Sequence, residues 1–110
     1  MQLIVSGRGV VLTPSVRSLI ERKVEKLERG GTRPLAVRVT CASQRFEQTV
    51  RLVTRARRRN FACQASADHL LTAVEGAVEM LCRQMREART RRRRARTRQQ
   101  PTAGVDVRGA

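Results

Sequence analysis

Arginine is the residue type in this 110-residue chain with the clearest chemical use. Lysine and arginine number 24 against 9 aspartates and glutamates, which gives a formal net charge of +15. Eight arginines and one glutamate between positions 86 and 98 carry +7 of this charge, and a second basic run, RARRRN, spans 55–60. Cations at this density bind polyanions, so we expect a polyanion to be the partner.

The other residues do not form a pattern typical of catalysis, metal binding or cofactor binding. His69 is the single histidine, with no cysteine near it in sequence and no paired carboxylates. We therefore expect no enzyme activity, no metal and no cofactor. Cys41, Cys63 and Cys82 are far apart and form no CxxC pair, so we expect them to be small core residues.

A helix that starts at Thr13 and Pro14 is expected to position the basic residues that follow Pro14 in the sequence. Threonine can cap the free amides, while the missing N–H of proline costs nothing in the first turn. Apolar residues then recur at helical spacing, and a glycine pair at 30 and 31 ends the run: Val16, Leu19, Ile20, Val24 and Leu27. Lys23 projects into this stripe, so its ammonium must either snorkel to solvent or lie in a groove between helices and reach a ligand.

Alternating apolar residues predict four strands, near 2–6, 35–42, 48–55 and 61–65. The 55–60 run would be an exposed basic hairpin loop between the last two strands. A second helix follows, with Asp68 as a plausible cap and one apolar stripe over four turns: Leu71, Val74, Val78, Leu81 and Met85. Continuing this stripe would place Arg89 and Arg92 at core positions, so the helix must leave the body there and run on as a basic arm.

The fold class is therefore α+β, in the order β-α-β-β-β-α. A mixed four-stranded sheet with two helices packed on one face buries all the apolar stripes together. We expect a folded domain over 1–88 and a basic, partly disordered C-terminal tail over 89–110. The chain shows no signal peptide and no membrane span, which favours a cytoplasmic protein that does not act at a membrane.

Two stretches of the sequence carry a family resemblance. The start MQLIVSGRGVVLTPSVRSLIERKVEKLE and the later AVEGAVEMLCRQM resemble the ribosome hibernation-promoting factor and ribosome-associated inhibitor A family, over about residues 1–88. The resemblance implies a protein that binds 16S rRNA of the small ribosomal subunit in the mRNA/tRNA channel. It would silence translation under stress or in stationary phase, take no small-molecule substrate, and be a monomer off the ribosome.

The resemblance also implies which cations contact rRNA. Family members use basic side chains on and beside the two helices, and the matching positions are Arg17, Lys23, Lys26, Arg83, Arg86 and Arg89. Leu71 and Met80 replace a tyrosine and a lysine of the family, and the arginine loop replaces a glycine-rich turn. The chain resembles the short class, which lacks the extra C-terminal domain.

Two alternative functions stay open. A general double-stranded RNA-binding domain also places two helices on one side of a sheet and recognises duplex shape. A regulator could instead contact protein or an anionic membrane through the basic tail, as an older family label of sigma-factor modulation suggests. Phe46 and Phe61 are the only aromatic residues, so recognition should rest on phosphates and shape rather than on base stacking.

Overall fold

The elements follow the predicted β-α-β-β-β-α order in a computed structural model that describes residues 1–30 and 33–99. A short 3-10 helix, η1, is added after the first helix. The bounds are β1 (Gln2–Arg8), α1 (Pro14–Val24), η1 (Glu25–Gly30), β2 (Ala36–Gln44), β3 (Glu47–Arg55), β4 (Asn60–Ala67) and α2 (Leu70–Gln99).

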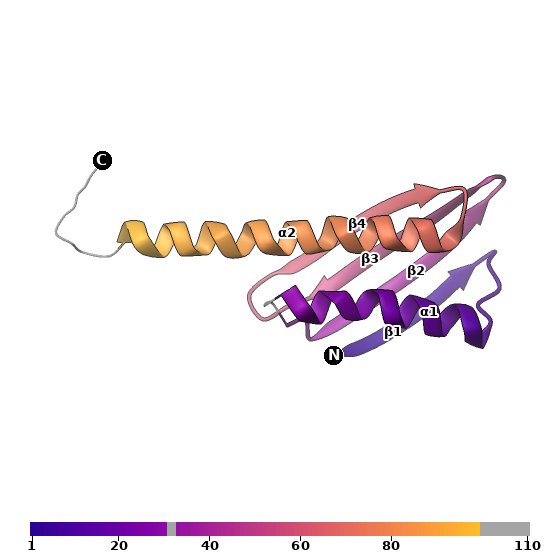
Figure 1. Cartoon of the computed structure of the whole chain (residues 1–110), viewed down its shortest axis with the longest axis horizontal. Helices are drawn as coiled ribbons and strands as arrows, with labels where there is room; N and C mark the ends of the chain where they lie inside the picture. Colours follow the sequence, from indigo (N-terminus) through magenta and orange to yellow (C-terminus); the bar gives the residue numbers. More distant parts are fainter. Residues whose placement is uncertain (31–32, 100–110) are drawn as a thin grey trace.

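The sheet has the order β1-β2-β3-β4, with β1 and β2 parallel and the other pairs antiparallel. Both helices lie on one face of it (Figure 1), which confirms the predicted α+β fold. Strands β1 and β2 can be parallel because α1, which follows β1 in sequence, returns the chain over one face of the sheet to the start of β2. On the opposite face every second strand residue is exposed or partly exposed, and Arg38 and Arg51 are among the exposed ones.

Helix α1 starts at Thr13 and Pro14, as predicted from the sequence. The Thr13 hydroxyl accepts a hydrogen bond of 3.2 Å from the backbone N–H of Val16, and Pro14 occupies the first turn. The expected single helix through Leu27 is wrong in one respect, because regular α-helix ends at Val24 and the chain tightens into η1. Leu27 is nevertheless buried, so η1 extends the apolar stripe.

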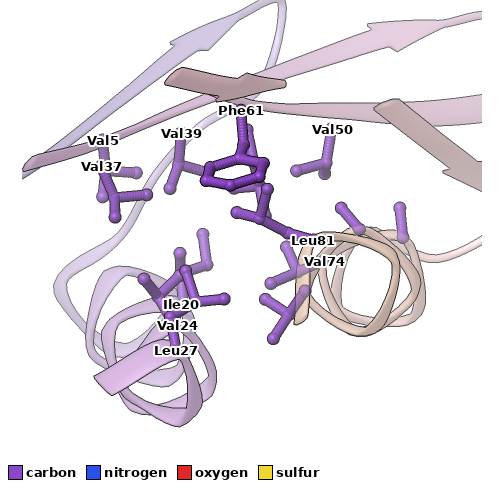
Figure 2. Packing of buried hydrophobic residues seen from close by; sticks show 14 of the residues in the cluster. Val5, Ile20, Val24, Leu27, Val37, Val39, Val50, Phe61, Val74 and Leu81 are labelled. Carbon is purple, nitrogen blue, oxygen red and sulfur yellow. The ribbon is translucent and has the colours of Figure 1, made fainter. Parts of the chain in front are cut away.

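The core lies between the sheet and the two helices (Figure 2). Ile20, Val24 and Leu27 point from α1 and η1 towards the sheet, and Val74 and Leu81 do so from α2. They meet buried side chains that alternate along the strands: Val5, Val37, Val39, Val50, Leu52 and Phe61. The predicted stripes of both helices are therefore confirmed as core for most of their residues: Val16 and Leu71 pack against the core while partly buried, and Leu19 is not part of it.

Helix α2 runs past the end of the sheet (Figure 1). Ala88 is the last buried residue among its described side chains, and the helix continues without interruption to Gln99. At its start, the carbonyl of His69 accepts the first helical hydrogen bond, so His69 holds the capping position predicted for Asp68. The expected division at 88 and 89 stays a prediction, and its disordered end falls on 100–110, outside the described residues.

Candidate nucleic-acid interface

A basic cleft lies where η1 packs against α2. Its cations are Lys26 and Arg29 from η1, and Arg86 and Arg89 from α2. Its apolar lining is Leu27, Cys82 and Met85, and its volume is about 220 Å³. Lys26, Arg29 and Arg86 are exposed and Arg89 is partly buried, so an anion from solution can reach all four cations.

Three of the six predicted contact residues meet in the basic cleft: Lys26, Arg86 and Arg89. On α2 the arginines are three residues apart, so they lie on one side of the helix as neighbours. Arg29 joins them and was not among the predicted residues. Its spacing of three from Lys26 could have indicated it, since the 3-10 geometry of η1 aligns residues at this interval.

Arg17 and Arg83 do not line the basic cleft. Arg17 lies in the first turn of α1, at the end far from η1, and its side chain is exposed. Arg83 is exposed on α2 outside the lining residues. Within the described part of the chain it forms no ion pair with Glu79, although the spacing of four would allow one.

Lys23 is bound by the protein's own α2. Its Nζ lies 2.7 Å from Oε2 of Glu75, and their side chains keep 27% and 49% of their exposure. Lys23 therefore lies between the helices, as one of the two predicted alternatives had it, but it reaches a carboxylate of the chain itself. The hydrogen bond and charge of Lys23, followed by the charge of Lys26, hold the pKa of Glu75 below its usual value.

A second cluster, the arginine pocket, flanks α2 beside the β3–β4 loop. Its volume is about 650 Å³, and its six arginines come from three separate segments: Arg33 before β2, Arg57, Arg58 and Arg59 in the loop, and Arg89 and Arg92 on α2. The loop was predicted as an exposed basic hairpin, which is confirmed. Its convergence with α2 was not predicted, because no local pattern indicates which segments meet.

The three cysteines belong to the packed interior. Cys41 is fully buried, whereas Cys63 and Cys82 are partly buried against the core, and all three are free thiols. Burial raises the pKa of each thiol, which disfavours the reactive thiolate. The expected packing role is confirmed.

Across residues 1–30 and 33–99, no group of three His, Cys, Asp or Glu side chains is placed to hold a metal ion. None of the helices in these ranges combines the length and apolar character needed to cross a membrane.

Residues 3–93 match the sequence model of a protein family described as "Sigma 54 modulation protein / S30EA ribosomal protein". The chain belongs to this family. The resemblance drawn from the two sequence stretches is thereby confirmed, and the match extends into α2 as far as Arg93, beyond the residues that carried the resemblance.

Two solved structures share the fold. The N-terminal domain of Protein Y from Thermus thermophilus has a TM-score of 0.73 and 18% identity, over 79% of this chain and 98% of that one. A ribosomal subunit interface protein from Coxiella burnetii has a TM-score of 0.71 and 18% identity, over 82% and 99%. A search of curated proteins found no match.

Proposed function

We propose that this protein associates with the ribosome in the cytoplasm and inhibits translation. It would bind rRNA of the small subunit in the mRNA/tRNA channel under stress or in stationary phase. The proposed action is occupancy of a site, so it requires binding and no chemistry. Family membership supports the ribosome as the partner.

The observation that carries the proposal is the basic cleft. Lys26, Arg29, Arg86 and Arg89 come from two elements and meet over one apolar floor. Folded rRNA presents phosphates at fixed positions, and cations held on a rigid body can match them better than cations on a flexible chain. Specificity would come from the shape of the RNA, because none of the described residues that line the cleft is an aromatic on which a base could stack.

Lys23 has a secondary place in this proposal. It lies between α1 and α2, outside the lining of the basic cleft, and Glu75 shares its charge. Since both side chains remain partly exposed, a phosphate could displace the carboxylate or bind from the open side.

The test is binding of the full chain to purified small subunits, measured by sedimentation at fixed ionic strength. The triple variant Lys26→Gln/Arg29→Gln/Arg86→Gln should bind roughly tenfold or more weakly, because three charge-assisted contacts are lost. A matched control is Arg8→Gln/Arg38→Gln/Arg51→Gln, which removes the same charge from exposed strand positions. Equal losses in both variants would mean that only net charge matters, and would refute a specific cleft.

Two further measurements separate the proposal from its alternatives. An excess of mRNA and tRNA should release the protein from the subunit if it occupies their channel. A plain RNA duplex at matched salt should bind much more weakly than the subunit. Equal affinity for both would favour a general double-stranded RNA-binding protein.

A further inference from the structure

The arginine pocket is distinct from the basic cleft, although both lie along α2 and share Arg89. Three segments far apart in sequence build it: the chain before β2, the β3–β4 loop and the emerging part of α2. Backbone hydrogen bonds hold the first two in place. The N–H of Leu35 donates to the carbonyl of Arg55 at 2.7 Å, and the N–H of Ala56 donates to the carbonyl of Arg59 at 3.1 Å.

All the charged side chains that line the pocket among the described residues are positive. Six arginines line it, and no acidic side chain does so among the described residues. Like charges this close repel one another, and salt screens part of the repulsion because the loop arginines are exposed. An anion bound here removes the repulsion and gains several guanidinium contacts at once. Phosphate oxygens suit these donors, since a guanidinium can bind two of them in parallel.

The floor of the pocket is apolar. It is lined by Leu35, Ala56, Phe61 and Ala88. Leu35 is 54% exposed, whereas Phe61 and Ala88 are buried. The guanidinium of Arg59 lies over the ring of Phe61, with its carbon 5.1 Å from the ring centroid. One face of the Arg59 guanidinium is thereby held against a ring, and guanidinium planes are surfaces on which bases stack.

We propose that the arginine pocket binds a phosphorylated nucleotide, with the base over Leu35 and Arg59 and the phosphates among the arginines. The volume of about 650 Å³ falls within the range of small-molecule sites. The nucleotide can be a free nucleoside polyphosphate or the phosphorylated 5′ end of an RNA strand. The combination of guanidiniums and an apolar floor favours a nucleotide over an acidic peptide, which would use the charge alone.

The experiment is a titration of the full-length protein, without ribosomes, with a fluorescent GTP analogue at fixed ionic strength. Arg57→Gln/Arg58→Gln/Arg59→Gln should raise the Kd roughly tenfold or more. Arg8→Gln/Arg38→Gln/Arg51→Gln removes the same charge elsewhere and should change the Kd far less. GTP should also raise the unfolding temperature of the wild type, but much less that of the loop variant.

Competitors decide whether the ligand is a nucleotide. Unlabelled GTP should displace the analogue better than inorganic triphosphate, and polyglutamate of equal charge should displace it poorly. Equal competition by triphosphate would overturn the role of the base, and effective competition by polyglutamate would overturn the nucleotide assignment. Arg59→Lys keeps the charge but removes the stacking plane. It should weaken GTP binding and leave triphosphate binding nearly unchanged, and equal effects on both would contradict the proposed pose.

The two sources of the nucleotide are distinguished with short RNA strands. If the pocket takes an RNA end, a 5′-triphosphate strand should bind more tightly than its 5′-hydroxyl counterpart, and the loop variant should lose this preference. If it takes free nucleotide, GTP should bind at least as tightly as the strand. Lys26→Gln/Arg29→Gln/Arg86→Gln should keep nucleotide binding while losing subunit binding, so the two proposals can fail separately.

Discussion

Glu75 is expected to weaken rRNA binding because it occupies Lys23. The perturbation is Glu75→Gln, which keeps the shape of the side chain and removes its charge. Nζ of Lys23 lies 2.7 Å from Oε2 of Glu75. A phosphate oxygen bound to the opposite side of Nζ would lie roughly 2.8 Å from it, and so roughly 5.5 Å from the carboxylate.

The size of the effect follows from this separation. Because the Glu75 side chain is 49% exposed, the dielectric constant of water is the appropriate one. Coulomb repulsion between two unit charges roughly 5.5 Å apart then weakens binding by a factor of about three to four. Removing the carboxylate should improve the Kd for small subunits by this factor, without adding any new contact.

The assay is a binding titration with small subunits at several salt concentrations. The control is Glu47→Gln, which makes the same change of charge at the exposed first residue of β3, on neither helix. The double variant Lys23→Gln/Glu75→Gln shows whether Glu75 acts through Lys23, since the improvement should then disappear. An unchanged Kd for Glu75→Gln, or an improvement that persists without Lys23, would refute the reasoning.

Three further predictions concern stability, titration and cysteine reactivity. Leu81→Ala should lower the free energy of unfolding by about 2–5 kcal/mol in urea titrations, because the side chain is fully buried, whereas Val11→Ala, at 83% exposure, should have little effect. NMR titration should place the pKa of Glu75 below that of an unperturbed glutamate, and its contribution to stability is present above the unfolded pKa and is lost as the pH falls through the lower folded pKa; an ordinary pKa would mean that the ion pair does not form in solution. Alkylation of the native chain should modify Cys41 more slowly than Cys82, because Cys41 is fully buried and Cys82 only partly; equal rates would contradict this packing.

The fold was predictable because each element shows its own period. Alternation marked the strands, and a spacing of three and four marked both helices with their buried faces. The parallel pairing of β1 with β2 followed from a helix between two neighbouring strands, and not from any residue in them. What failed was local detail, such as the change from α1 to η1 and the shift of the α2 cap from Asp68 to His69.

The candidate site was predictable only in part. Periodicity shows which face of a helix carries a cation, but not which residue of another element lies opposite. Lys23 and Glu75 are separated by 52 positions, so their contact depends on how α1 and α2 pack. The arginine pocket was missed for the same reason, since Arg33 and the β3–β4 loop become neighbours only when the sheet forms.

The arrangement of charge links stability to binding. Folding brings the cations of the basic cleft and the arginine pocket together, whereas the unfolded chain spreads them apart, so their mutual repulsion opposes folding. Added salt screens this repulsion and should stabilise the free protein, yet it also reduces the gain from counterion release when RNA binds. A polyanion that fits the folded arrangement better than the unfolded chain raises stability by mass action. The same cations therefore predict that salt stabilises the free protein and weakens its complex with RNA, two opposite responses that a neutral binding surface would not produce.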